Sequence, residues 1–599
     1  MCRQGIHLVS VLLIILRLTP PGISQTSQPQ AQPSQLPTNN SSEPVATFQA
    51  STRMVTLEVV ARDGHGRHAT GLKASDFRVF EQTPAREKEK HEQKIAAFRE
   101  VTVADLAKQA GSATQIPAGV HTNLVTLQKN PVPPTILLVD GLNTQLEYQA
   151  QVHIQMLRML RSLPANVPVA VFLFGHRLQM LQDFTSDPSL LQAALEKAIS
   201  VAATGVARID PRDDSDQVSA QVQNLAPKPG GTAAQDAIAA EVAALAQIAL
   251  KFDLRQYAAQ MDMRVNETSE ALVSLARHVA GYPGRKNLLW ISTSFPISLD
   301  PLKYDIFFKD VGQRNYWVQM QRVAAALSEA KVVVYPINPA GVRTPALYEA
   351  ANRPSDTSGQ GTADALGRET ILRAGEQDTM QVLAEGTGGK VCTGDNDLGD
   401  CVRKAVDDSG TFYEIAYYPD SQNWNGEYRK ITLKSQRPGL HLAYRQGYFA
   451  RQEAGDNPKE QKSELEQAAC EDYLNATSIF FAAKSLPPDS PEKLKFYLMV
   501  NTAALTLIPT SDGGRNLNIV VAVCTFDKKG SPLQLMSEPV NRKLSASEYQ
   551  SLTAVGGLSH VVTIPGPKPV SLRLLIKDIP SGRLGSVQIK VEDSVAAPK

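Results

Sequence analysis

The sequence predicts an α/β protein in which a doubly wound, mostly parallel sheet is flanked by β-sandwich modules. Uninterrupted apolar runs such as TILLVDG (135–141) and VPVAVFLF (167–174) are typical of strands that are buried on both faces. These runs alternate with helical patterns that are joined by short turns, as in βαβ units. Before and after this region, apolar residues alternate with polar ones, which indicates antiparallel strands.

The N-terminus has the features of an export signal. Arg3 precedes an apolar run over residues 6–16, and small residues suited to cleavage follow at 22–24. Arg17 and the shortness of the run argue against a permanent span, which needs about 20 apolar residues. A retained anchor is the alternative. We expect a signal peptide over 1–24 and a protein that is secreted, or held in the periplasm or cell envelope, with no membrane span after cleavage.

A linker and a small β module are expected next. Residues 25–50 are rich in Gln, Pro and Ser and lack apolar periodicity, which predicts a disordered linker. Residues 51–105 then form an N-terminal β module, because apolar residues alternate from Val55 and the sequence DGHG (63–66) is typical of a hairpin turn. Three strands make a thin core, so this module needs strands from elsewhere.

The α/β domain is expected over residues 130–408. Its main strands are predicted at 135–141, 167–174, 287–292 and 331–337, and its helices at 148–163, 189–199, 269–279 and 318–330. An insertion over 200–265 interrupts the alternation. Its alanine-rich part, roughly 233–261, predicts a long helix with an apolar stripe. A last strand is expected at GGKVC (388–392).

Sequence typical of strands returns after the α/β domain. Residues 409–450 contain aromatic-rich hairpin patterns. We expect these strands to complete a β-sandwich with residues 51–105, because neither set looks sufficient alone and the α/β domain would be inserted between them. A charged linker over 451–468 then leads to a C-terminal β-sandwich over 469–595.

The cysteines agree with export. Cleavage of the signal peptide removes Cys2 and leaves four cysteines, an even number that suggests disulfides in an oxidising compartment. Cys392 and Cys401 flank a short, turn-rich loop and are the best pair, and Cys470–Cys524 follows by elimination. Four buried free thiols are the alternative. No CxxC motif occurs, so structural zinc and redox catalysis are poorly supported.

Asp140, at the end of the strand TILLVD, is the leading candidate for a functional residue. In doubly wound sheets, ligands bind beyond the carboxyl ends of the strands, and we expect Asp140 to reach an exposed rim there. Its carboxylate would hold a metal ion or cap backbone N–H groups of the turn that follows. The residues around Asp140 leave both roles open.

Five segments are informative by their order and spacing: VVARDGHGRHATGLKASDFRVFEQ, TILLVDGLNT, RVNETSEALVSLARHVAGYPGRKNLLWISTSFP, KVVVYPINPAGV and YEIAYYPDSQNWNGEYRKITLKSQRPGLHLAYRQGYFA. Through these segments the chain resembles, over about 55–591, the VWFA-related acidobacterial domain family, which is related to the von Willebrand factor A domain. The resemblance implies a von Willebrand A-like domain flanked by β modules, and it implies no known ligand.

Von Willebrand A-type domains often hold Mg²⁺ in a metal-ion-dependent adhesion site, and the resemblance implies a degenerate form of that site here. Asp140 matches the first ligand and Thr144 the second of two serines, whereas Leu142 stands where the first serine is expected. Thr268 is the best match to a threonine from a later loop, with Thr232 as its rival. No carboxylate stands near the position of the last aspartate, in WISTSF. With one carboxylate, the affinity for Mg²⁺ would be low.

The sequence favours a binding protein over an enzyme. The net charge of +1 gives no electrostatic reason to expect nucleic acid as the partner. No GxSxG, HExxH or P-loop motif occurs. His65 and His68 share a turn with Asp63, which is more typical of solvated residues than of a metal clip, and His176 would be a general base beside Asp140 with no nucleophile.

We therefore expect a non-enzymatic binding or adhesion protein that presents the strand-end face of its α/β domain to a protein or glycan partner. The alternatives are a hydrolase whose active site lies at the same face, and a scaffold subunit of an envelope assembly in which the alanine-rich helix is the docking element.

Overall fold

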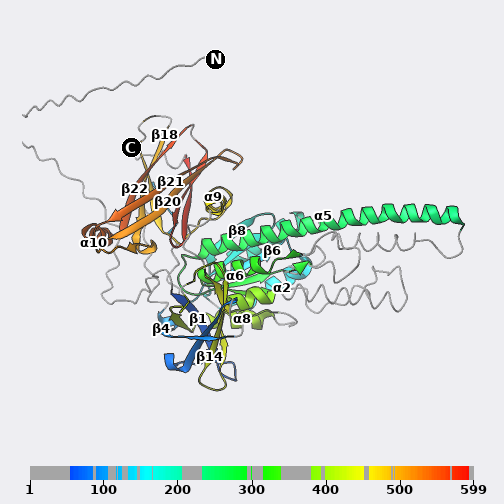
Figure 1. The fold of residues 1–599 in the computed structure, drawn as a ribbon, viewed down its shortest axis with the longest axis horizontal. Helices are drawn as coiled ribbons and strands as arrows, with labels where there is room; N and C mark the ends of the chain where they lie inside the picture. Colours follow the sequence, from blue (N-terminus) through cyan, green and yellow to red (C-terminus); the bar gives the residue numbers. More distant parts are fainter. Residues whose placement is uncertain are drawn as a thin grey trace, which may run out of the picture. The chain divides into compact units, whose positions relative to one another are not determined.

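The computed structural model shows a mixed α/β protein with several sheets (Figure 1). It describes residues 54–84, 89–105, 117, 119–124, 132–144, 149–164, 166–205, 232–292, 298–299, 314–338, 380–392, 398–421, 423–450, 458–487, 490, 493–566 and 569–591. The expected signal peptide (1–24), the first linker (25–50) and the segment around Thr293 lie outside these residues.

A five-stranded sheet combines parallel and antiparallel strands. Its order is β12 (Val332–Ile337), β9 (Lys286–Ile291), β6 (Thr135–Asp140), β7 (Val169–Phe174) and β8 (Leu178–Thr185). The first four strands run parallel, and β8 is antiparallel to β7. The sequence analysis did not expect β8, whose exposed, polar-rich pattern lacks the apolar run of the others.

Helices pack on both faces of this sheet. Alternate residues of β6 point to opposite sides, so Ile136 and Leu138 join one hydrophobic core while Leu137 and Val139 join another. The helices on the first face are α5 (Ala233–Val279) and α6 (Trp317–Glu329); those on the second are α2 (Gln149–Ser162), α3 (Pro188–Gly205) and α8 (Leu398–Asp408). Because both faces are covered, all six residues of β6 are buried, as its apolar sequence predicts.

Helix α5 differs from the expectation of two helices, at 233–261 and 269–279. It is one uninterrupted helix of 47 residues. The residues between the two expected helices include no proline or glycine, so nothing in the backbone ends the helix there. Thr268 consequently lies within a helix and not in a loop.

Strands from the two sides of the α/β region pair directly with one another. In one sheet, β13 lies between β1 and β4, with β15 on the outer side of β1; in a second, the order is β16-β14-β2-β3. The bounds are β1 (Val55–Arg62), β2 (Phe77–Gln82), β3 (His91–Gln93), β4 (Ile95–Val101), β13 (Phe412–Tyr417), β14 (Tyr428–Ser435), β15 (His441–Ala443) and β16 (Gly447–Phe449). Apolar residues of both sheets share one core, to which Leu57, Val79, Ile415 and Ile431 contribute.

The C-terminal region also contains two sheets that share a core. Their orders are β22-β18-β17-β5 and β19-β20-β23-β24, with β21 paired to β20. The bounds are β5 (Val120–Thr122), β17 (Phe481–Leu486), β18 (Lys493–Asn501), β19 (Ile508–Pro509), β20 (Arg515–Phe526), β21 (Pro532–Leu544), β22 (Gly557–Pro565), β23 (Ser571–Asp578) and β24 (Leu584–Lys590). Helix α10 (Ala546–Val555) also belongs to this region, whereas the short strands β10 (Ser298–Leu299) and β11 (Arg314–Asn315) lie between β9 and α6 in the sequence.

Two parts of this region were not expected from the sequence. Strand β5 comes from the chain that precedes the α/β domain, and it pairs with β17. The side-chain amide of Asn123 secures it by donating to the carbonyl oxygens of Ala476 and Ile479 at 2.7 and 2.8 Å. Helix α9 (Pro458–Glu466) lies within the segment expected to be a linker, 451–468.

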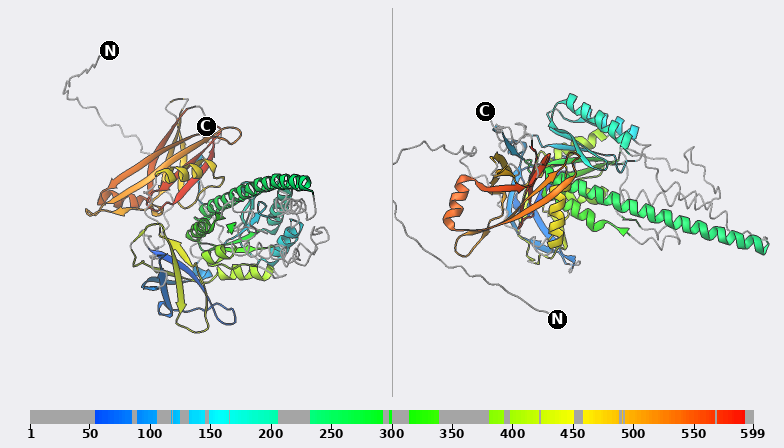
Figure 2. Two further views of the ribbon diagram at one scale, coloured as in Figure 1. Left: turned by 45° about the vertical axis from the view of Figure 1, so that its right-hand side comes forward. Right: turned by 90° about the horizontal axis from the view of Figure 1, so that it is seen from above.

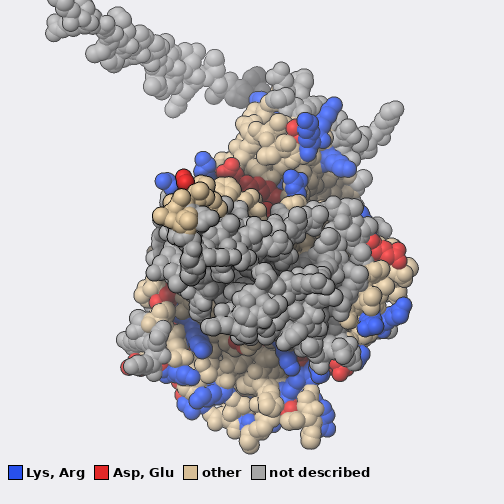
Figure 3. Space-filling view, turned by 90° about the vertical axis from the view of Figure 1, so that its right-hand side faces the viewer, with Lys and Arg blue, Asp and Glu red and all other residues tan. Residues whose placement is uncertain are grey.

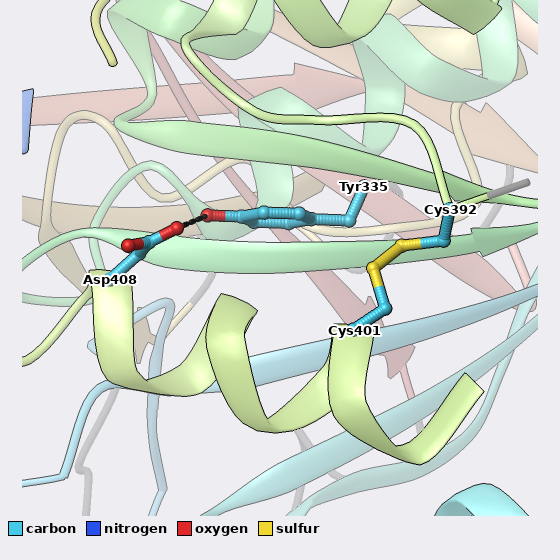
Figure 4. The surroundings of a disulfide bond; sticks show 4 residues. All are labelled: Tyr335, Cys392, Cys401 and Asp408. Carbon is cyan, nitrogen blue, oxygen red and sulfur yellow. Dashed lines mark hydrogen bonds between the residues drawn. A yellow bond between two sulfur atoms is a disulfide. The ribbon is translucent and has the colours of Figure 1, made fainter. Parts of the chain in front are cut away.

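Two disulfides link the four described cysteines, one across a short loop and one across a long segment. Cys470 is bonded to Cys524 of β20, with Cα atoms 5.5 Å apart. Cys401 of α8 is bonded to Cys392, with Cα atoms 6.1 Å apart (Figure 4). Cys392 forms an isolated parallel bridge with Ile337 and does not belong to a named strand, so the expected strand over 388–392 is reduced to this bridge.

Within the described residues, no helix is suited to span a membrane, because none combines the length and hydropathy that a span requires. The described part of the face drawn in Figure 3 also shows no patch made only of basic or only of acidic residues. Basic and acidic residues are interspersed there. This mixture agrees with the balanced net charge of the chain.

Candidate functional site

Asp140 is the last residue of β6, between the parallel neighbours β7 and β9. The chain turns immediately after it, because the backbone N–H groups of Gly141 and Leu142 both donate to the carbonyl oxygen of Phe174, at 2.7 and 3.2 Å. The Leu142 side chain points into the core and is buried there. The turn therefore leaves Asp140 under the loop and not on its outer surface.

The Asp140 carboxylate is fully engaged by nearby donors. Its Oδ1 accepts the backbone N–H of Asn143 at 2.9 Å. Its Oδ2 accepts the Asn143 side-chain Nδ2 at 2.8 Å and the indole Nε1 of Trp290 at 3.1 Å. The bond to the backbone is the capping role that the sequence analysis set against metal binding.

Asn143 links this carboxylate to helix α5. Its Nδ2 also donates to Thr268 Oγ1 at 3.0 Å, and its Oδ1 accepts from Arg264 Nη2 at 3.0 Å. Thr268 Oγ1 in turn donates to the carbonyl oxygen of Arg264 at 2.7 Å. We call Asp140, Asn143, Arg264, Thr268 and Trp290 the strand-end cluster. Its members come from β6 and the following turn, from α5 and from β9.

Burial sets the electrostatics of the cluster. Asp140 is only 1% exposed. Burial raises the pKa of its carboxyl, and hydrogen bonds from Asn143 and Trp290 oppose that rise by favouring the charged form. Burial has the larger effect, so the pKa of Asp140 lies above its ordinary value.

The expectation that Asp140 stands on an exposed rim is wrong. The position along the strand is as expected, but the side chain is buried. The reason is local: Asn143 folds back over the carboxylate from one side, and Trp290 of the neighbouring strand covers it from another. The apolar pattern predicts correctly where Asp140 lies along the strand, but it does not predict which side chains cover the carboxylate.

The other predicted site residues are only partly brought together. Thr268 joins Asp140 through Asn143 and makes no direct bond to the carboxylate among the described residues. Thr144 is half-buried, and its Oγ1 has no hydrogen-bond partner among the residues that the structure describes. Thr232 precedes the first turn of α5, roughly 50 Å along the helix from Thr268 at 1.5 Å per residue. It cannot replace Thr268 in the cluster.

The residues around Asp140 do not fit a Mg²⁺ ion. Mg²⁺ requires oxygen ligands in near-octahedral geometry, yet the Asn143 Nδ2 group donates to both Asp140 and Thr268, the two oxygens that an ion would bridge. An NH₂ group there repels a cation. Asp140 is the one carboxylate in the cluster, and the described residues contain no group of three His, Cys, Asp or Glu side chains placed to hold a metal.

Sequence reasoning missed Asn143, Arg264, Trp290 and the fully buried Ser292, which follows β9. Asn143 had a signal, since it stands three residues after a strand-end Asp in DGLN, where a side-chain amide can fold back. Trp290 and Ser292 could have been identified because they stand at the end of the predicted strand that pairs with β6. Arg264 had no such signal, because its role depends on α5 continuing unbroken to Thr268.

The histidines do not form a catalytic site with these residues. His176 is exposed in the turn after β7, and within the described part of the chain Asp140 accepts its hydrogen bonds from Asn143 and Trp290. In the turn after β1, Asp63 Oδ1 accepts the backbone N–H of His65 at 2.9 Å, and His68 Nε2 lies 3.0 Å from Asp407 Oδ2. Asp63 therefore binds the backbone of His65, while the His68 ring contacts Asp407.

Comparison with known proteins places the chain near several solved structures, at low similarity. No protein-family model matches the chain, and no curated protein matches it. BatB from Bacteroides thetaiotaomicron, a conserved hypothetical protein, is 12% identical with a TM-score of 0.22, over 46% of this chain and 97% of BatB. An aerotolerance-related membrane protein from Bacteroides fragilis is 11% identical with a TM-score of 0.21, over 46% of this chain and 98% of that protein.

A von Willebrand factor type A protein from Catenulispora acidiphila is 10% identical with a TM-score of 0.17, over 67% of this chain and 74% of that protein. These values describe a weak likeness to a von Willebrand A-type structure. At such TM-scores they carry no conclusion about function.

Proposed function

We propose that the protein is an exported, non-enzymatic binding protein that takes a protein or glycan partner at the strand-end face of its α/β domain. In this proposal the domain is doubly wound and von Willebrand A-like, and β-sandwich modules flank it. The face is the edge at which β6, β7 and β9 end, above the strand-end cluster. The export signal and the resemblance of the sequence segments motivate the proposal.

One observation carries most of the argument: Asn143 donates to Asp140 and to Thr268 from the same nitrogen, at 2.8 and 3.0 Å. This arrangement fixes the turn after β6 to helix α5 by hydrogen bonds alone. A binding face needs loops that a rigid scaffold holds in place. In this protein the cluster supplies that rigidity without an ion, so we propose that partner binding does not depend on Mg²⁺.

The same contacts disfavour the hydrolase alternative. A general base must reach the proton that it removes, but both oxygens of the Asp140 carboxylate already accept hydrogen bonds from the protein. Burial of Asp140 also keeps it from a substrate. No specific observation among the described residues favours catalysis.

Binding assays on the purified chain test the proposal. The probes are a glycan array and a panel of extracellular proteins, each measured with 1 mM Mg²⁺ and with excess EDTA. Wild-type protein is expected to bind at least one probe equally in both conditions. Asn143→Ala is expected to weaken that binding about tenfold or more, because the turn after β6 loses its link to α5.

Glu329→Ala is the matched control, since Glu329 is exposed at the end of α6, just before β12 begins at the opposite edge of the sheet. Equal loss of binding in both variants would count against the strand-end face, as would binding that EDTA abolishes. Turnover of an ester, phosphate or glycoside that Asp140→Ala removes would overturn the proposal in favour of the hydrolase.

A further inference from the structure

The N-terminal half of α5 buries none of its described side chains. Every described residue from 232 to 256 is exposed, whereas buried residues begin at Ala258 and recur at Met261 and Val265. We call residues 233–256 the α5 arm. In Figures 1 and 2 this part of the green helix continues past the ends of the sheet strands.

Large apolar residues form a stripe along the α5 arm. Ile238, Leu245, Ile248 and Phe252 are 63–67% exposed, and Val242 is 37% exposed. An exposed apolar stripe of this length is unusual on a soluble surface, because water contact with each of these side chains is unfavourable. The stripe is therefore a candidate surface for contact with another molecule.

The spacing of the stripe identifies the kind of partner. The steps from Ile238 to Val242 and then to Leu245 are four and three residues, and Phe252 follows seven residues after Leu245. Exposed Met263 continues the same register. This 3.5-residue repeat is the signature of a coiled-coil seam, whose natural partner is another helix with the same repeat.

The charges on the arm favour a second copy of the same helix in antiparallel orientation. Glu241 and Arg255 are exposed, and they lie seven residues before and seven after Ile248, so all three share one heptad position beside the seam. If two arms cross antiparallel with the Ile248 residues level, Glu241 of each copy lies level with Arg255 of the other. A parallel pair would instead set like charges at the same level.

We infer that the α5 arm is a dimerisation element through which two copies of this chain form a short antiparallel coiled coil. The apolar stripe is buried between the two arms, and two symmetric Glu241–Arg255 ion pairs set the orientation and register. The contact involves about three heptads, or roughly 30 Å of helix at 1.5 Å per residue. This interface lies outside the strand-end cluster and does not depend on the proposed binding function.

Sedimentation velocity of the full chain over about 1–100 µM tests the inference, since this range covers weak, specific association. The wild-type mass is expected to rise with concentration from 65.0 kDa toward twice that value. The double variant Leu245→Glu/Ile248→Glu is expected to weaken association at least tenfold. Ala240→Glu is the matched control, because it adds a charge to an exposed position on the far side of the same helix and should leave association unchanged.

Charge reversal tests the orientation. Glu241→Arg and Arg255→Glu are each expected to weaken association several-fold, and the two substitutions combined in one chain are expected to restore it, because reversed charges still meet their opposites in an antiparallel pair. Failure of the double reversal to restore association would overturn the antiparallel assignment. A chain that stays monomeric at 100 µM, or whose arm instead binds phosphatidylcholine vesicles, would overturn the inference as a whole.

Discussion

The side-chain nitrogen of Asn143 lies 2.8 Å from Asp140 Oδ2, where a metal ion would lie if Asp140 and Thr268 were its ligands. Asn143 is neutral, so it satisfies the buried carboxyl group through hydrogen bonds and not through an opposite charge. Because the same nitrogen also donates to Thr268, one amide performs the bridging that an ion performs in a metal site.

Asn143→Ala is expected to lower the free energy of unfolding by about 1–3 kcal/mol, because the oxygens of Asp140 and Thr268 lose a donor while they remain buried. Urea denaturation of the full chain measures this change. Asn516→Ala, at an exposed strand position, is the control and should change stability by less than about 0.5 kcal/mol. Equal effects of the two substitutions would contradict the bridging role.

Asn143→Asp is expected to create a divalent-cation site that the wild type lacks. A second carboxylate beside Asp140 repels the first in the absence of metal, and a hard cation relieves that repulsion. In calorimetric titrations with Mg²⁺, Mn²⁺ and Ca²⁺, the variant should bind at least one ion, whereas the wild type shows no heat of binding at the same concentrations. Millimolar binding by the wild type that Asp140→Ala abolishes would contradict our interpretation of the cluster.

Lys286→Met should alter the pH dependence of stability. Lys286 is fully buried at the start of β9, and its Nζ donates to the Tyr282 carbonyl oxygen at 2.7 Å. Its pKa is lowered from 10.5 to about 7, mainly by burial and to a smaller extent by nearby Lys331, while Glu58 opposes the shift. Between about pH 7 and 10 the unfolded chain binds a proton that the folded chain does not, so stability rises with pH in this window.

Below about pH 7 the full cost of burying this lysine is present. The methionine variant is therefore expected to be more stable than the wild type at pH 6, by roughly 2–4 kcal/mol, with the difference shrinking toward pH 10. Urea denaturation at pH 6, 8 and 10 measures it. Lys528→Met, on an exposed hairpin turn, is the control. A pH-independent difference between Lys286→Met and wild type would show that this titration does not govern stability.

The two disulfides are expected to contribute unequally. Cys392–Cys401 closes a loop with a sequence separation of 9, and Cys470–Cys524 one of 54. Loop-closure entropy then predicts losses of about 3 and about 4 kcal/mol when each pair is replaced by alanine. Thermal or urea unfolding of the two double variants gives the order, and the reduced wild type should lose stability by at least the larger amount. The reverse order would show that packing around the shorter loop outweighs chain entropy.

Helix α8 shows why the shorter disulfide matters locally. Cys401 lies in the N-terminal part of α8, while at its C-terminus Asp408 accepts a hydrogen bond from the Tyr335 hydroxyl at 3.3 Å (Figure 4). The helix is thus tied to the strand β12 region at both ends. Loss of the disulfide leaves the tyrosine contact as the remaining tie among these residues, so the N-terminal turn of α8 should exchange amide hydrogens first.

Much of the fold follows from sequence patterns, because those patterns report burial. The apolar run that ends at Asp140 predicted β6, since only a strand covered on both faces tolerates such a run. The pairing of residues 52–104 with 410–450 was predicted because neither set of strands looks sufficient to form a core alone. In the structure, β13 does lie between β1 and β4. Strand β5 carried no comparable signal, because its three residues depend on β17 for their structure.

The site was harder to predict than the fold. An aspartate at a strand end is equally compatible with a metal and with a cap, and the difference depends on the third residue after it, Asn143, and on Arg264. Neither residue type is diagnostic in a sequence. Trp290 donates to Asp140 only because β9 lies beside β6 in the sheet. The order of strands in a sheet cannot be read from a local sequence pattern.

Helix α5 carries no glycine or proline along its 47 residues, so it has none of the usual points at which a helix bends. The same rod presents Phe252 to solvent, supplies Thr268 to the strand-end cluster, and near its end places His278 Nδ1 2.8 Å from the Asn475 carbonyl oxygen. One continuous helix therefore contacts both the turn that follows β6 and the segment that leads into the C-terminal strands. A substitution that breaks the helix near Thr268 is accordingly expected to disturb both contacts, although they lie in separate parts of the fold.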